Sequence, residues 1–325
     1  MSAIKYSVII PCSRSAGLRP LLDALLRQTL PSDTYEVIIV VPYNAEKLAI
    51  SDPRLRVVET SRLFLPGHMR NIGAKAAHAD LLCFIDDDCV PPLNWLERMI
   101  ADLQSDTDIG LAGCRIKGDP PTFWNRCADF ALFSDYQSQN RECLGLGSAA
   151  IAARRTAIDE AGGFDNDLAA SEDWELSSSV KSKGWKLTFN PDVEVLHRHG
   201  RGSPTVIVCQ AYRYGYFSGL IVQRRHRDQM SWIGRVAVRC ANPLVYMFWM
   251  PFAAMLTGIF QIWTLRGADP LLPLFSPIML SARFSYQLGV LHRLFRDRQI
   301  PSEGISHRSP LDRPVRKDGC CSNND

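Results

Sequence analysis

The sequence predicts an α/β fold in which helices cover both faces of a mostly parallel sheet. Continuous β-branched runs, Tyr6 to Ile10 and Tyr35 to Val41, are typical of strands buried on both faces. Stretches with apolar residues at helical spacing alternate with such runs along the first half of the chain. The 325 residues suffice for two domains or for one large α/β domain with an appendage.

The first elements follow one another in βα order. A leucine-rich helix is expected over Leu18 to Leu30, a third strand over Leu55 to Glu59 and a small-residue helix over Gly67 to His78. The next buried strand, Leu81 to Ile85, runs directly into three aspartates. Ligands of such sheets bind at the carboxyl ends of the strands, which is where these aspartates fall.

Later elements are expected to be shorter, and the pattern between Cys114 and about Asn140 is irregular. Gly162 and Gly163 are expected to end one of the helices. The expected elements are helices over Trp95 to Leu103, Thr156 to Ala161 and Glu172 to Lys183, and strands over Trp185 to Asn190 and Val193 to Leu196.

Charge and cysteine content narrow the class of protein. The 37 basic and 34 acidic residues nearly balance, which gives no argument for a nucleic-acid partner. The ten cysteines form no CxxC pair and no zinc-spaced cluster, so they are expected to be reduced, which favours the cytosol. The first residues, MSAIKYSVIIP, contain no apolar stretch long enough for a secretory signal.

A membrane segment is predicted in the second half of the chain. Pro243 to Leu265 holds 23 residues without a charge, and a helix of that length crosses a hydrocarbon core of roughly 30 Å. The alternative is a buried core helix broken at Pro251. A second apolar stretch, Leu271 to Leu291, contains Arg283 and two prolines, so it is expected to be re-entrant or interfacial.

Arginines flank this pair of stretches on both sides, whereas the loop between them holds only Arg266 and Asp269 as charged residues. The positive-inside rule then predicts a hairpin with both flanks in the cytosol. The location expected is the cytoplasmic (bacterial inner) membrane, with the first domain facing the cytosol.

The acidic run Asp86-Asp87-Asp88 is the first candidate site. Adjacent carboxylates repel one another, and a divalent cation such as Mg²⁺ or Mn²⁺ supplies the missing countercharge. If strand alternation continued through the run, Asp86 and Asp88 would face one way and Asp87 the other. The alternative is a solvated turn that caps the next helix, but the position directly after a buried strand favours a metal site.

A second acidic site comes later, at Ser171-Glu172-Asp173. Ser171 is suited to cap the following helix, and acidic residues suit its first turn, so capping alone is one explanation. With the earlier acidic run, another explanation opens: one cluster holds a metal and a pyrophosphate while the other deprotonates an incoming hydroxyl.

The third candidate is Arg70, in the run RNIGA. Its guanidinium offers a fork of donors for a phosphate, and the glycine that follows lets the backbone approach a ligand. The alternative is an ordinary surface arginine on a tightly packed helix.

These motifs together resemble glycosyltransferase family 2, with the GT-A (Rossmann-like) nucleotide-diphospho-sugar transferase fold, over about residues 6 to 220. Each motif is weak alone, but five in the right order are specific. They are YSVIIP, YEVIIVV, RNIGAKAAHADLLCFIDDDCVPP, RRTAIDEAGGFDNDLAASEDWEL and VEVLHRHG. The predicted organisation is a GT-A domain at 1–220, a membrane-associated helical hairpin or re-entrant segment at 221–298, and a polar, disordered tail at 299–325.

The resemblance implies an inverting transfer by single displacement, with Mg²⁺ or Mn²⁺ and a nucleotide-sugar donor. It implies Asp88 as the direct metal ligand, with Asp86 and His197 as further ligands. The residues expected to contact the donor are Pro11, Arg70, Asp86 and Asp87. The family's ED motif maps onto Glu172-Asp173, with Asp173 as the base that takes the proton from the acceptor hydroxyl.

The sequence departs from the family pattern in two places. Where many relatives carry an acid at the end of the second strand, this chain reads VVPYN from Val40, so the nucleotide, UDP or GDP, stays open. The QxxRW-like motif of processive synthases is missing, which favours transfer of one sugar.

The predicted function is a metal-dependent transfer to a saccharide or lipid-linked acceptor, in cell-surface polysaccharide or glycolipid synthesis. Two alternatives stay open. One is nucleotidyl transfer on a related fold, for which the run SRSAG from Ser13 is a poor match. The other is a degenerate member that scaffolds a membrane complex for glycan assembly.

Overall fold

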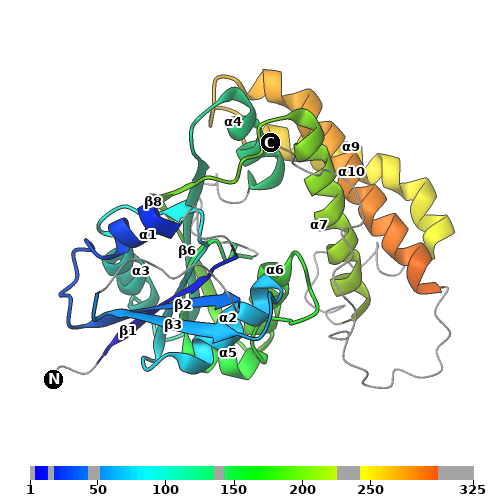
Figure 1. Ribbon diagram of the computed structural model, residues 1–325. Coiled ribbons are helices and arrows are strands. Elements are labelled where there is room, and N and C mark those ends of the chain that lie inside the picture. Colours follow the sequence, from blue (N-terminus) through cyan, green and yellow to red (C-terminus); the bar gives the residue numbers. More distant parts are fainter. Residues whose placement is uncertain are drawn as a thin grey trace. The chain divides into compact units, whose positions relative to one another are not determined.

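A computed structural model describes residues 4–13, 18–42, 52–134, 143, 145–224 and 242–298. The chain divides into two compact units, Met1–Gly200 and Arg201–Asp325. The first unit holds the sheet and the second is helical (Figure 1). The domain boundary predicted at residue 220 falls inside α7 (Pro204–Arg224).

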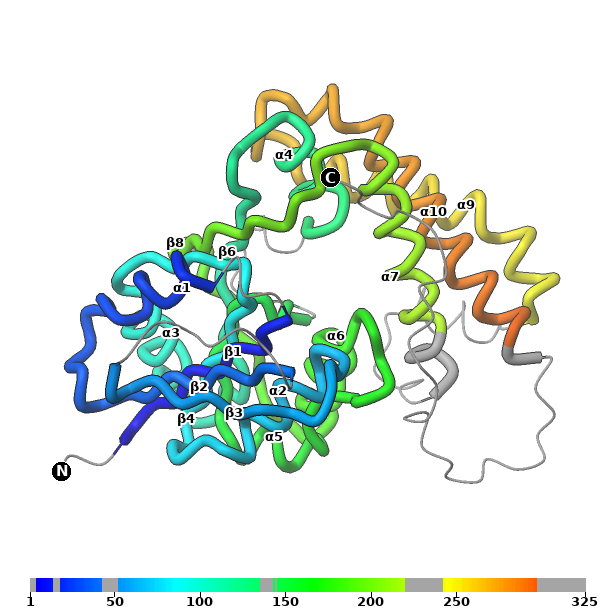
Figure 2. Tube along the Cα trace, in the orientation of Figure 1, coloured from blue at the N-terminus to red at the C-terminus, as the bar shows by residue number. Residues whose placement is uncertain are grey.

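The first unit is built on one eight-stranded sheet with the order β3-β2-β1-β4-β7-β6-β8-β5. In chain order the strands are β1 (Tyr6–Pro11), β2 (Tyr35–Pro42), β3 (Leu55–Thr60), β4 (Leu81–Ile85), β5 (Cys89–Val90), β6 (Ile109–Gly118), β7 (Ala150–Arg154) and β8 (Lys186–His197). Strands β1 to β4 pair in parallel, as do β6 and β8. The pairings of β7 and of β5 are antiparallel, so the sheet is mixed. Figure 2 shows β1 and β2 side by side. Strand β4 pairs with β1 along its other edge.

Helices cover both faces of this sheet, as predicted. In chain order they are α1 (Leu18–Leu25), α2 (Pro66–Ala76), α3 (Trp95–Gln104), α4 (Phe123–Leu132), α5 (Arg155–Ala161) and α6 (Glu172–Ser182). In β2, Val37 and Ile39 join the core that contains α1 and α3, whereas Ile38 and Val40 pack with Met69 of α2. Figure 1 places α1 and α3 on one face and α2, α5 and α6 on the other.

The element boundaries confirm most predictions, and three were wrong. The stretch expected to be irregular from Cys114 holds the end of β6 and all of α4. The sequence of β6, IGLAGCRIKG, has no β-branched run, so the strand signal was weak. Helix α1 ends at Leu25 rather than Leu30, and the two late strands form one continuous β8 with irregular pairing to β6.

The second unit packs α10 (Leu272–Arg298) against both α7 and α9 (Pro243–Thr264). Gly215 and Gly289 permit the close approach of α7 and α10, since a Cβ at Gly215 would lie 1.8 Å from the carbonyl oxygen of Tyr286. Within the described ranges, α9 alone is long and apolar enough to cross a membrane, judged by length and composition.

Candidate active site

The three carboxylates of the acidic run lie at the carboxyl end of β4. The amide of Cys89 donates to the carbonyl of Asp86 (3.1 Å), so the chain turns here instead of continuing as a strand. The strand alternation expected for Asp86 and Asp88 therefore does not apply. Asp87 accepts a hydrogen bond from the backbone N–H of Ser13 (2.7 Å), just beyond β1.

Asp86 is bound to a buried arginine. Arg70 of α2 is 2 % exposed, and its Nη2 donates to Asp86 Oδ1 at 2.6 Å. Its Nη1 donates to Glu172 Oε1 at 2.7 Å. Burial works against the charge of Arg70, but Asp86 and Glu172 outweigh burial and raise its pKa. The burial of Arg70 contradicts the alternative of an ordinary surface arginine. The two terminal nitrogens of its guanidinium, which were predicted to bind a phosphate, donate to carboxylates instead.

Asp173 stands in the first turn of α6, directly after Glu172. Its Oδ1 accepts from the backbone N–H of Trp174 (2.8 Å) and its Oδ2 from that of Ser148 (3.3 Å). Burial, followed by the nearby charge of Glu172, raises the pKa of Asp173 to about 7. A carboxylate with that pKa is suited to exchange a proton at neutral pH.

The residue before this turn, Ser171, adopts φ 65°, in the left-handed region that residues with a Cβ rarely occupy. It stands at the N-cap position, but its side chain makes no capping hydrogen bond, so the predicted capping role was wrong. Backbone strain of this kind persists where the surroundings hold it, and it concentrates at functional sites.

The two acidic motifs meet through the entrance to β7, which the sequence did not single out. The backbone N–H of Asp86 donates to the carbonyl of Ala149 (3.0 Å), and the N–H of the preceding Ser148 donates to Asp173. The backbones of the consecutive residues Ser148 and Ala149 thus hydrogen-bond to both acidic motifs. No side-chain chemistry marked Ser148 and Ala149 in the sequence, because both act here through their backbones.

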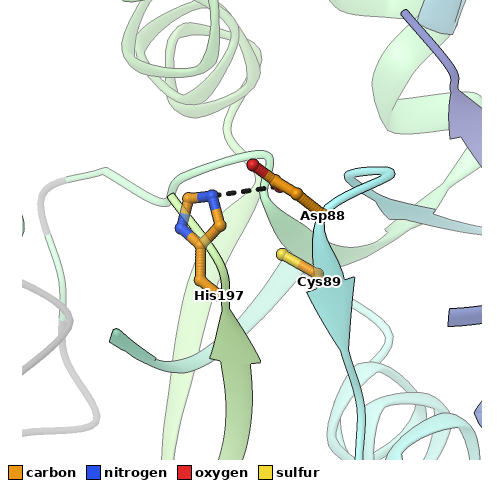
Figure 3. Close-up of side chains that lie close together, drawn as sticks. All are labelled: Asp88, Cys89 and His197. Carbon is orange, nitrogen blue, oxygen red and sulfur yellow. Dashed lines mark ion pairs between the residues drawn. The ribbon is translucent and has the colours of Figure 1, made fainter. Parts of the chain in front are cut away.

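Asp88, Cys89 and His197 form the third part of the site. His197 ends β8, pairs with Cys89 of β5 and lies with its Nε2 3.1 Å from Asp88 Oδ1 (Figure 3). One possible ligand atom from each of the three residues lies within 4.8 Å of the others. Among the described residues, Nδ1 of His197 is buried and has no hydrogen-bond partner.

This donor set fits a divalent metal. Asp88 offers the carboxylate oxygen that Mn²⁺ and Mg²⁺ prefer, and the His197 nitrogen 3.1 Å away suits a transition metal such as Mn²⁺ better than Mg²⁺; either ion takes further ligands from water and substrate phosphates. The Cys89 thiol fits less well, because burial and the three neighbouring aspartates raise its pKa well above the usual range. Asp86, the other predicted ligand, is outside this group and faces Arg70.

The remaining predicted contact, Pro11, is buried at the carboxyl end of β1, two residues before the Ser13 that binds Asp87. At the end of β2, Val41 is 3 % exposed, and its carbonyl accepts from the hydroxyl of Thr60. The segment 43–51 and most of the SRSAG run lie outside the described residues.

Comparison with known proteins agrees with this fold. Residues 7–162 match the model of the family described as Glycosyl transferase family 2. The chain is 26 % identical over 203 residues to glycosyltransferase AglE of Haloferax volcanii, and 28 % identical over 240 residues to the pre-mycofactocin glycosyltransferase of Mycobacterium tuberculosis. These matches cover 59 % and 69 % of this chain, but 66 % and 49 % of the relatives. Residues 7–162 of the chain therefore form a domain similar to glycosyltransferase family 2.

Solved structures show the same fold. The mannosyltransferase PcManGT from Pyrobaculum calidifontis, in complex with GDP-Man and Mn²⁺, is similar with a TM-score of 0.59 at 17 % identity. That match covers 91 % of this chain and 88 % of the mannosyltransferase. TarS 1–349 of S. aureus has a TM-score of 0.51 at 16 % identity, covering 92 % and 93 % of the two chains. The fold is therefore GT-A, as the sequence predicted.

Proposed function

We propose that this protein transfers one sugar from a nucleotide-sugar donor to a hydroxyl of a saccharide or lipid-linked acceptor, with inversion and with Mn²⁺ or Mg²⁺. The observation that carries the proposal is the joining of two acidic motifs through Ser148 and Ala149. One motif supplies Asp88, which lies beside His197 as the proposed metal-ligand pair, and the other supplies a carboxylate whose pKa is about 7.

The donor side of the proposal rests on Asp88 and His197 as metal ligands. A metal bound there would stabilise the negative charge that develops on the leaving nucleoside diphosphate. Asp87 accepts from the N–H of Ser13, and we assign Ser13 and Pro11 to the nucleotide. The similar structures with GDP-Man and Mn²⁺, and with UDP-GlcNAc, support a donor of this chemical class.

On the acceptor side, Asp173 is the proposed general base. The acceptor oxygen attacks the anomeric carbon from the face opposite the leaving group and forms the new glycosidic bond. The bond from that carbon to the diphosphate oxygen breaks, and its electron pair leaves with the nucleoside diphosphate. The acceptor proton passes to an Asp173 carboxylate oxygen, which is ionised in part of the molecules at neutral pH.

A membrane location is also proposed, with the catalytic unit on the cytosolic side. The support is α9, whose large apolar side chains are exposed along the helix; Phe248 is 73 % exposed and Phe260 65 %. An exposed apolar surface of this length fits lipid better than water. A lipid-linked acceptor would be held near such a membrane.

The membrane proposal has its own test. The full chain is expressed, and the membrane fraction is washed with alkaline carbonate, which removes peripheral proteins. Retention of the chain in the pellet supports the location, and its release contradicts insertion of α9. Phe248→Asp is expected to reduce retention.

The enzymatic proposal is tested first by binding and then by turnover. Calorimetry with UDP and with GDP, each with and without Mn²⁺, should give binding that needs the metal. Incubation with UDP-glucose, UDP-GlcNAc or GDP-mannose should release the nucleoside diphosphate slowly. Pyrophosphate release from a nucleoside triphosphate and a sugar phosphate would instead indicate nucleotidyl transfer. Absence of nucleotide binding would favour the scaffolding alternative.

A further inference from the structure

Helix α2 lies in close contact with the segment that leads into the second acidic motif. A Cβ at Gly67 would lie 2.9 Å from the carbonyl oxygen of Asp165 and 3.2 Å from Cβ of Phe164. On the other side, Gly163 has φ +79°, and a Cβ there would lie 2.8 Å from Asn71 Oδ1. Glycines on both partners therefore bring the helix and the segment together without intervening side chains.

The side chain of Asn71 binds this segment through all of its hydrogen-bonding groups. Its Oδ1 accepts from the backbone N–H of Phe164 (2.9 Å), and its Nδ2 donates to the carbonyl of the same residue (2.8 Å). Its Nδ2 also donates to Oδ1 of Asn166 (2.9 Å). Among side chains of this length only an amide offers an acceptor and two donors, so asparagine is matched to the position.

The residue bound by Asn71 connects to the donor site. Phe164 is 2 % exposed and packs edge-on against Phe84 of β4, the strand that ends in the acidic run (ring centroids 5.2 Å apart). The guanidinium of Arg70 lies over the ring of Phe164, 5.4 Å from its centroid. The same guanidinium ties Glu172 to Asp86. The segment is thus fixed near its start by Asn71 and at its end by Arg70.

We propose that Asn71 is a positioning residue for the transfer reaction. Through Phe164 it holds the 163–172 segment, and so sets where the proposed base Asp173 stands relative to the donor. In the hydrogen bonds described, Asn71 touches neither the metal-ligand pair nor Asp173. Its effect reaches the site through Phe164 and the 163–172 segment, which leads to the base, so we expect it to alter the placement of Asp173 more than donor binding. This inference rests on the proposed function.

The expected consequence is a split between turnover and binding. Misplacement of a reacting group by about 1 Å costs about 100-fold in rate. Asn71→Asp has the same shape, but it turns a carboxylate oxygen toward the carbonyl of Phe164, where the native amide donates. We therefore expect kcat to fall about 10- to 100-fold at unchanged KM for the donor.

The experiment uses the full chain as wild type, Asn71→Asp and Asn71→Ala. Asn166→Ala is the matched control, because it removes only the exposed third hydrogen bond and leaves both bonds to Phe164. Release of nucleoside diphosphate is measured with the sugar donor that wild type accepts, and calorimetry measures UDP and GDP binding with Mn²⁺. Hydrogen exchange followed by mass spectrometry reports on residues 163–172.

The inference is supported if both Asn71 variants bind the nucleotide like wild type, exchange faster in residues 163–172 and lose turnover, while Asn166→Ala resembles wild type. It is overturned if the Asn71 variants keep wild-type kcat, or if nucleotide affinity falls in parallel with kcat. A wild-type protein that releases no nucleoside diphosphate from any donor overturns the proposed function itself, and the inference with it. The two failures are therefore distinguished by the wild-type measurement.

Discussion

Two acidic clusters of similar chemistry lie at opposite ends of the parallel strands. At the amino ends of β1 and β2, Glu36 is bound by Arg56. At the carboxyl end of β4, Arg70 binds Asp86 and Glu172. Each cluster buries a carboxylate with an arginine, yet only the second has the features of a reactive site.

The cluster around Glu36 is fully satisfied. Glu36 is 3 % exposed, and its carboxylate accepts from the hydroxyl of Ser7 (2.8 Å), the backbone N–H of His78 (2.8 Å) and Arg56. Burial alone would raise the pKa of Glu36, but these hydrogen bonds outweigh it and lower the pKa. The group is therefore held as a carboxylate and serves to join strands and helix ends.

At the carboxyl end of β4, burial outweighs the favourable contacts of the carboxylates, so their pKa values are raised and not lowered. Burial raises the pKa of Asp86 despite the charge of Arg70, and the pKa of Asp173 is also raised. Within the part of the chain that the structure describes, Nε of Arg70 and Nδ1 of His197 are buried and have no hydrogen-bond partner. Ser171 is in a left-handed conformation. The carboxyl end of the strands, where a ligand is expected, thus holds polar atoms without partners among the described residues and a strained backbone residue. The amino end holds a carboxylate with several hydrogen bonds, as is typical of a structural cluster.

The strongest test of this contrast is Asp173→Asn. Loss of a general base typically costs about 100- to 10,000-fold in rate, so we expect kcat for transfer to fall within that range. The variant should still bind UDP or GDP with Mn²⁺, because Asp88 and His197 are unchanged. Glu36→Gln is the matched control, and it should keep its turnover per folded molecule. Wild-type turnover in Asp173→Asn would refute the assignment of the base.

The second test concerns the proposed metal-ligand pair, Asp88 and His197. His197→Ala removes the imidazole that lies 3.1 Å from Asp88, and we expect the affinity for Mn²⁺ in the presence of nucleotide to fall about tenfold or more, as measured by calorimetry. His78→Ala is the control at the other end of the sheet, since its ring contacts Glu36 instead. Equal Mn²⁺ affinity in the two variants would show that His197 is no ligand.

The third test concerns the cluster around Glu36, which is expected to contribute to the free energy of unfolding. In Glu36→Gln an amide N–H₂ group replaces one carboxylate oxygen and meets donors from Ser7, His78 or Arg56. A buried donor left unsatisfied costs about 1–3 kcal/mol, and we expect the free energy of unfolding to fall by that amount in urea titrations. An unchanged midpoint would mean that this cluster contributes little to stability.

The sequence predicted much of the fold because β1, β2 and β4 are continuous apolar runs whose period and length leave few alternatives. The resemblance to family 2 singled out Asp88, His197 and Asp173 as candidates, and the structure brings Asp88 and His197 together, while the roles of all three stay predictions. The sequence did not predict that Arg70 would face carboxylates, since the partners of a long side chain depend on tertiary packing. The hydrogen bonds of Ser148 and Asn71 were also missed, because backbone bonds and a single amide leave no pattern in one sequence.

The measurement that separates the two clusters most directly is the pH dependence of stability. Glu36 has a lowered pKa in the folded state, so its contribution is present above the ordinary glutamate pKa of about 4.3 and is lost as pH falls through the folded value. Asp173 has a pKa raised to about 7, so the folded state holds a proton that the unfolded state has released above about 4. Stability from Asp173 therefore falls as pH rises from about 4 to 7.

Urea titrations of wild type and Asp173→Asn from pH 5 to 8 measure this term, because the difference in unfolding free energy between the two should shift in favour of the variant as pH rises. Over the same range kcat of wild type should rise, since transfer needs the ionised carboxylate. Opposite slopes of stability and turnover, both removed by one substitution, would identify a single group as the origin of both. A stability difference that is flat over this range would mean that Asp173 is already ionised at pH 5, and it would remove the contrast with Glu36.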